Sequence, residues 1–212
     1  MSSPTLFRLS GLALLLGAIL AIVAIVGHNA VRQASEFADI TNSPSVTFVR
    51  LLMVGALLVI IGLPGLYARQ AERAGVLGLL GFVMTFVGLL FADVVMTANY
   101  GFIMPKIAAT SEGRALIESG LPDPGFMMLV FPMILIGLLL LGIGIVRAKV
   151  LPRWMGLLFV AGVLFIPVAS AVPLIAHLFS APIFLAFASC GYALVRDTPQ
   201  VAWRHEPAQQ VS

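Results

Sequence analysis

Residues 49–96 read VRLLMVGALLVIIGLPGLYARQAERAGVLGLLGFVMTFVGLLFADVVM, two apolar runs separated by a polar segment at residues 67–74. Each run holds about 18 to 22 residues, which at a rise of about 1.5 Å per residue is enough to cross a hydrocarbon core of about 30 Å. Backbone groups inside lipid must be satisfied within their own segment, so both runs are predicted to be helices. The stretch therefore predicts a transmembrane hairpin whose polar segment forms a tight turn.

The composition of the whole chain points to the same class of protein. Of its 212 residues, 60% are hydrophobic and 10% are charged, and the mean hydropathy is +1.09. A soluble domain carries about 25% charged residues and about 45–50% apolar ones, so a soluble core is excluded. The net charge of +3 is modest and is explained by membrane topology, which predicts no nucleic-acid partner. Cys190 is the single cysteine of the sequence, so no intramolecular disulfide can form.

These features predict an all-α integral membrane protein, a single domain over residues 1–212 built as a bundle of six transmembrane helices. The predicted spans are residues 9–27, 49–66, 76–98, 126–146, 154–175 and 179–195, and residues 28–48 and 101–124 are outer loops. Within these loops we expect a short amphipathic helix over residues 31–38 in the membrane interface. We also expect a helix capped by Thr110 that runs through Ser119.

The distribution of basic residues predicts the orientation. If the N-terminus is inside, eight basic residues lie in inner segments and four in outer ones. The inner set is Arg8, Arg69, Arg73, Arg147, Lys149, Arg153, Arg196 and Arg204, and the outer set is Arg32, Arg50, Lys106 and Arg114. Basic residues concentrate in cytoplasmic segments, so the N- and C-termini are both predicted to be cytoplasmic.

Asp93 is the one acid inside a predicted span, and its depth suggests a partner. Arg50 lies about 21 residues before the middle of the polar turn and Asp93 about 22 residues after it, so the two sit at nearly the same height in the hairpin. A charge in the membrane favours pairing, which predicts an Arg50–Asp93 ion pair acting as a structural clamp. Alternatively, Asp93, Thr97 and Tyr100 share a helix face at i, i+4 and i+7 and, with Asn99 at a similar depth, line a pocket.

Two histidines are the candidates for holding a cofactor. His28 ends the first predicted span and His177 ends the fifth, so both are expected at the outer face with Asp93. Two imidazoles and a carboxylate can bind a metal, ligate a haem or exchange protons. The alternative is structural, since imidazoles suit helix ends at a membrane interface. We assign no metal ligand and no catalytic residue.

Two segments carry a resemblance. Residues 66–82, LYARQAERAGVLGLLGF, and residues 151–158, LPRWMGLL, are similar to the turns and helix starts of a set of bacterial multi-pass membrane proteins of unknown function. The resemblance implies a multi-pass protein of the bacterial cytoplasmic membrane. It carries over no activity, cofactor or site residue.

Three functions follow as expectations. The absence of phosphate-binding, metalloprotease, nucleophile-elbow and CxxC motifs favours a non-enzymatic accessory or structural subunit that packs with a membrane partner or a second copy. Its support is two small-residue faces, one of Ala13, Gly17 and Ala21 and one of Ala186 and Cys190. The first alternative is a protein that binds or transports a small lipophilic molecule in an outward-facing pocket near Asp93. It requires a cavity between the third and fifth helices. The second alternative is a membrane redox enzyme that uses His28 and His177.

Overall fold

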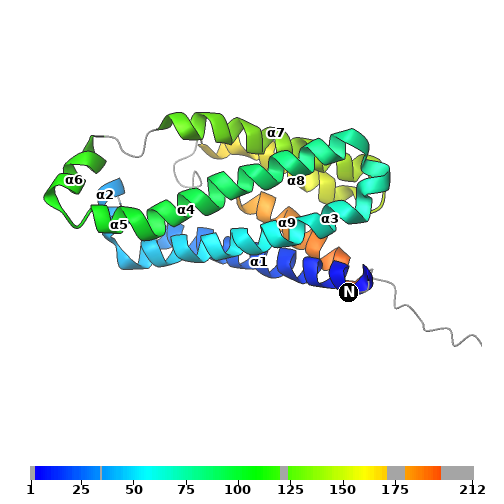
Figure 1. Cartoon of the computed structure of the whole chain (residues 1–212), viewed down its shortest axis with the longest axis horizontal. Helices are drawn as coiled ribbons and strands as arrows, with labels where there is room; N and C mark the ends of the chain where they lie inside the picture. The colour runs from blue at the N-terminus through cyan, green and yellow to red at the C-terminus, as the bar shows by residue number, and fades with distance from the viewer. Residues whose placement is uncertain (1–2, 34, 120–123, 171–179, 197–212) are drawn as a thin grey trace, which may run out of the picture.

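The computed structural model of the chain describes residues 3–33, 35–119, 124–170 and 180–196. Each element in these ranges is a helix, which confirms the predicted all-helical class (Figure 1). The elements are α1 Ser3–Val31, α2 Glu36–Thr41, α3 Ser43–Leu89, the π-helical turn η1 Leu90–Val95, α4 Met96–Ala98, the π-helical turn η2 Asn99–Ile103, α5 Met104–Ile107, α6 Ser111–Glu118, α7 Pro124–Ala148, α8 Arg153–Ser170 and α9 Ala181–Arg196.

Within the described ranges, three helical segments are long and apolar enough to cross a membrane, namely Thr5–Val31, Ser43–Ile107 and Met128–Ala148. Two shorter apolar helices, Arg153–Pro167 and Ala181–Arg196, accompany them. Large apolar side chains are exposed along these helices, as a bilayer solvent requires. The architecture is therefore that of a membrane-embedded helical protein.

The long segment Ser43–Ile107 folds back on itself at Gly75, whose backbone angles are φ 59° and ψ −161°. It thus forms two antiparallel legs, a first leg (residues 43–74) and a second leg (residues 76–107) (Figure 1). The rings of Tyr67 and Phe82, one from each leg, stack with their centroids 4.8 Å apart. The hairpin predicted from sequence is present, but residues 67–74 remain helical and the reversal is made by the glycine that follows them.

The helices form a closed ring in which each contacts its neighbours. The first leg packs on α1, the second leg on α7, α7 on α8, α8 on α9, and α9 on α1 again. Glycines allow the closest approaches: a Cβ added to Gly17 would lie 2.6 Å from the carbonyl oxygen of Gly55, and one added to Gly191 would lie 2.6 Å from the amide nitrogen of Leu15.

The small-residue faces noted in the sequence are therefore used inside the chain. Ala21, Ala186 and Cys190 are fully buried, and Gly17 faces the first leg. These faces were expected to receive a membrane partner. In the structure they carry contacts among α1, α3 and α9, because backbones can approach closely only where side chains are small, and the membrane partner stays a prediction.

One end of the ring carries a cap built from α2, α5 and α6, opposite to the end at which α3 reverses its direction (Figure 1). That reversal is at Gly75. A small apolar cluster of Ile40, Met104, Ala108 and Ile117 holds the cap together. Helix α6 starts as predicted, since Thr110 Oγ1 accepts a hydrogen bond of 3.0 Å from the Gly113 amide. The amphipathic helix expected over residues 31–38 is not formed, because α1 continues to Val31 and α2 begins only at Glu36.

Candidate functional site

A cavity of about 260 Å³ lies inside the ring, toward the capped end. Every long helix contributes to its wall. The lining residues are Ala24, Ile25 and His28 of α1, Phe48, Val49, Leu52 and Leu89 of α3, Ala92 and Asp93 of η1, Phe131, Ile134, Leu135 and Leu138 of α7, Ile166 of α8, Ser180, and Ile183 and Phe184 of α9. The cavity required by the pocket hypothesis is thus present beside Asp93, between the second leg and α8.

Among the described residues the wall is apolar except at three, His28, Asp93 and Ser180. Of these, His28 and Asp93 are titratable and come from different helices. Binding sites for small molecules have this composition, a mainly apolar and aromatic wall with a few polar groups that fix the orientation of the ligand.

Asp93 reaches the cavity from the π-helical turn η1. A π turn accommodates an extra residue and interrupts the α-helical hydrogen-bond ladder, and such turns are frequent at functional sites. The interruption is closed by Thr97, whose hydroxyl donates to the carbonyl oxygen of Asp93 and lies 3.2 Å from that of Val94. Thr97 therefore supports the backbone that presents Asp93.

The ion pair predicted between Arg50 and Asp93 is not formed. Arg50 Nε instead donates a hydrogen bond of 2.8 Å to the carbonyl oxygen of Gly101, and its guanidinium lies 4.7 Å from the centre of the Phe102 ring. The reason is the position of the reversal. The prediction centred the turn near residue 71, and moving it to Gly75 shifts the residue opposite Arg50 from Asp93 to Gly101.

The three polar residues predicted to share the Asp93 pocket are dispersed. Thr97 is buried and Asn99 lines neither this cavity nor its small neighbour. Tyr100 lines the neighbour, a cavity of about 40 Å³ under the cap. The shared face assumed the rotation of an α-helix, and the π turns η1 and η2 on either side of α4 change that rotation.

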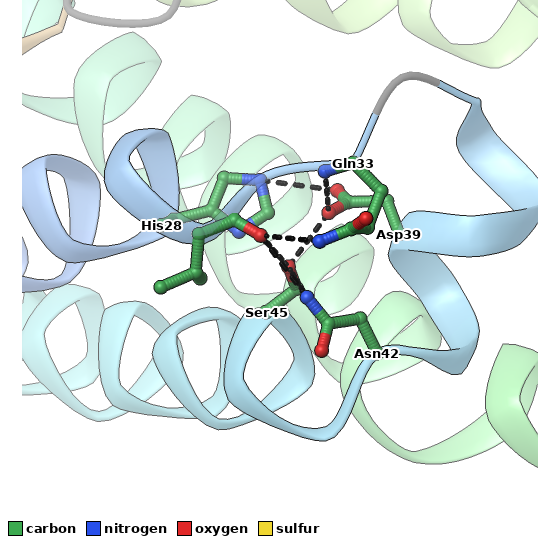
Figure 2. A network of polar contacts seen from close by, with 6 residues as sticks. His28, Gln33, Asp39, Asn42 and Ser45 are labelled. Atoms are coloured by element: carbon green, nitrogen blue, oxygen red, sulfur yellow. Dashed lines mark hydrogen bonds and ion pairs between the residues drawn. The ribbon is translucent and has the colours of Figure 1, made fainter.

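His28 lies between the two cavities and lines both. Its Nε2 is 3.3 Å from Asp39 Oδ2, close enough for an ion pair when the imidazole is protonated. Its Nδ1 is buried and has no hydrogen-bond partner within the described ranges. Asp39 Oδ1 accepts two hydrogen bonds, one from Ser45 Oγ at 2.6 Å and one from the backbone N–H of Gln33 at 3.1 Å (Figure 2).

The same network fastens the end of α1 to the start of α3. The side-chain amides of Gln33 and Asn42 each donate to the carbonyl oxygen of Val31 at 3.0 Å, which satisfies an acceptor at the helix end (Figure 2). Asn42 also donates to Ser45 Oγ at 3.2 Å. Sequence reasoning did not identify this network, because no motif in residues 28–48 marks Asp39 as a partner of His28 or Ser45. The available signal was Asn42-Ser-Pro-Ser45, a run of capping residues and a proline that marks a helix start.

The paired-histidine hypothesis has one residue outside the described part of the chain. His177 falls in residues 171–179, so its position relative to His28 is not described. Among the described residues, no group of three or more His, Cys, Asp or Glu side chains is arranged to hold a metal ion.

A third cavity, of about 200 Å³, lies at the Gly75 end between Phe7, residues 68–73 and Val150. It adjoins Gln70, which is only 1% exposed and whose two amide atoms have no hydrogen-bond partner in the described residues. Arg69 and Arg73 line the same space. This cavity is polar and does not share a residue with the Asp93 cavity.

Comparison of the chain with protein-family models, curated proteins and solved structures finds no match in any of the three. The candidate site therefore rests on the geometry of this chain alone.

Proposed function

We propose that the protein binds a small, mainly apolar molecule in the cavity beside Asp93 and His28. The observation that carries this proposal is the cavity itself, about 260 Å³ of space lined mainly by apolar side chains from all the long helices. Protein interiors are close-packed, and an unfilled space of this size is costly unless something occupies it.

The volume limits the size of the ligand. A dry apolar cavity of about 150 Å³ accepts benzene, and ligand pockets commonly start near 300 Å³. A space of about 260 Å³ therefore fits one ring with a short substituent, or an alkyl chain of similar bulk. Three aromatic walls, Phe48, Phe131 and Phe184, favour a ring.

The accessory-subunit function draws less support. It rested on the small-residue faces of α1 and α9, and both faces are occupied by contacts within the chain. A partner protein or a second copy would have to use other surfaces. The redox function depends on His177 and gains nothing from the described residues.

The setting of the site is also a proposal. We propose six membrane crossings, with both termini in the cytoplasm of a bacterial cell and the Asp93 cavity toward the outer face. Either leg of the segment Ser43–Ile107 exceeds the roughly 20 residues that one crossing needs. The basic residues Arg69, Arg73 and Lys149 are at the Gly75 end, which supports placing that end in the cytoplasm.

Photolabelling tests the binding function. A phenyl diazirine labels apolar side chains that it contacts, and the fragments are read by mass spectrometry. We expect adducts on Ile134 and Leu138, which are buried and line the cavity, as well as on the exposed Ile136. Adducts confined to Ile136 would contradict the proposal, because label dissolved in lipid or detergent reaches that residue without entering the ring.

A filled cavity supplies the control. Ala24 is fully buried and lines the cavity, so Ala24→Leu is expected to remove the adducts on Ile134 and Leu138 while leaving those on Ile136. Ala161→Leu makes the same change at an exposed position of α8 and is expected to leave all adducts in place.

A further inference from the structure

Asp93 brings a carboxyl group to the mainly apolar wall of the cavity, and no described residue provides a counter-charge for it. Within the described residues it makes no ion pair within 4 Å, and the arginine closest to it in predicted depth, Arg50, is engaged by Gly101 and Phe102. A carboxylate at this depth costs several kcal/mol unless it is paired or neutral. When Asp93 is ionised, no side chain in the described part of the chain supplies the positive charge that would pair with it.

One of the other residues that line the cavity, His28, has a buried ring nitrogen without a hydrogen-bond partner among the described residues. His28 Nδ1 is buried and unpartnered in the described part of the chain, while Nε2 faces Asp39. A neutral imidazole that turns its Nε2–H toward the Asp39 carboxylate presents Nδ1 as an acceptor. His28 Nδ1 and the Asp93 carboxylate are then acceptors, while the Ser180 hydroxyl can accept or donate, so a ligand that complements all three is a donor or a cation.

The aromatic side chains fit the same ligand. Phe48, Phe131 and Phe184 line the cavity from three different helices. Aromatic faces attract cations, and the attraction is strongest where water is excluded. An apolar wall of this kind binds the carbon skeleton of an amphiphilic cation, and the carboxylate balances its charge.

We propose that the ligand of the cavity is a lipophilic ammonium ion of about one ring in size, with its nitrogen held against Asp93. This inference rests on the proposed binding function and adds the charge of the ligand to it. Asp93 is then a binding residue, and Thr97 positions it through the π turn.

Two isosteric probes separate the charge from the shape. Benzyltrimethylammonium and neopentylbenzene differ in one atom at the branch point, nitrogen in the first and carbon in the second. Each is tested for its ability to protect Ile134 and Leu138 from the phenyl diazirine. The probes partition differently into a bilayer, so the half-protecting concentration of each is compared between wild type and variants.

The decisive variant is Asp93→Asn, which keeps the shape of the side chain and removes the charge. We expect it to raise the half-protecting concentration of the cation at least about tenfold, as loss of a buried charge partner does, and to leave that of neopentylbenzene within about twofold. Glu112→Gln removes an acid from the exposed surface of α6 and is expected to change neither value.

The outcomes distinguish the two proposals. If neopentylbenzene protects the cavity but Asp93→Asn does not weaken the cation, the ammonium inference is wrong and the binding function stands. If neither probe protects Ile134 and Leu138 in the wild type, the binding function itself is wrong. Because protection by the neutral probe shows that the variant is folded, a loss confined to the cation cannot come from misfolding.

Discussion

The Nε atom of Arg50 in α3 donates a hydrogen bond of 2.8 Å to the carbonyl oxygen of Gly101 in η2, joining the first leg to the second leg at the capped end. The two residues lie on either side of Gly75 at almost equal separations along the chain. The bond therefore reports the register of the hairpin, and it leaves Asp93 without the partner that its depth suggested.

This relationship predicts the outcome of a double-mutant cycle. Arg50→Gln is expected to destabilise the fold by about 1 kcal/mol, from a partly exposed hydrogen bond and the contact with Phe102. Asp93→Asn should act independently, so the effects of the two substitutions should add within about 0.5 kcal/mol. Unfolding in mixed detergent measures the free energies. A coupling energy above about 1 kcal/mol between the two substitutions would indicate that Arg50 and Asp93 do form an ion pair.

The reversal at Gly75 predicts a cost for any side chain at that position. Its φ of 59° with ψ of −161° belongs to a region that is essentially restricted to glycine. A Cβ there would meet nothing within 4 Å, so Gly75→Ala tests the backbone alone. We expect a loss of about 1–3 kcal/mol of stability. Val76→Ala at the neighbouring exposed position is the control, and equal stability of the two variants would contradict the reversal at Gly75.

The burial of the Gln70 side chain leads us to expect that replacing it with an apolar residue increases stability. Its amide is buried without a hydrogen-bond partner in the described residues, a state that costs about 1–3 kcal/mol. Gln70→Met keeps the length of the side chain and removes the polar atoms, so the melting temperature should rise. Gln33→Met provides the contrast, because the exposed amide of Gln33 bonds to Val31. A lower melting temperature for Gln70→Met would mean that a molecule in the adjoining cavity satisfies the amide.

The hydrogen bond from Ser45 to Asp39 allows the contribution of the network around His28 to the stability of the fold to be measured. The residue is 1% exposed and its hydroxyl donates to Asp39 at 2.6 Å, a hydrogen bond to a carboxylate that is worth about 1.5–3 kcal/mol. Ser45→Ala should lose stability in that range and speed hydrogen exchange in α2. Thr47→Ala removes an exposed hydroxyl of the same helix, and its effect should be small. Similar losses for both variants would show that the network holds nothing in place.

The sequence predicted the all-helical class because the chain consists mainly of long apolar runs, and each run indicates a helix independently of the others. It misplaced the turn of the hairpin because Arg69, Glu72 and Arg73 suit a turn at the membrane surface as well as they suit the end of a helix. The deciding residue was Gly75, which needs a positive φ that charge patterns do not report. A displacement of four residues in the turn was enough to separate Arg50 from Asp93.

The candidate site was predicted only in part. Asp93 and His28 were named as candidates, and both line the cavity. The cavity itself could not be predicted, because an apolar composition does not indicate whether side chains fill the space between the helices. Thr97, Asn99 and Tyr100 were predicted to line a pocket with Asp93, but they are not among the residues that line the cavity. The π turns η1 and η2 change the rotation of the helix, so these residues do not share an α-helical face with Asp93. The Asp39–Ser45 network depends on contacts between segments that no periodicity encodes.

The contact between Gly11 of α1 and Gly191 of α9 joins the first described helix to the last. The ribosome makes these helices at opposite ends of synthesis, so α1 waits in the bilayer while the rest of the chain is inserted. The ring can close only when α9 arrives, and the wall that Ile183 and Phe184 contribute arrives with it. A truncated or still-nascent chain is therefore expected to have an open groove where the finished protein has a cavity, and the proposed binding should begin only once α9 has packed.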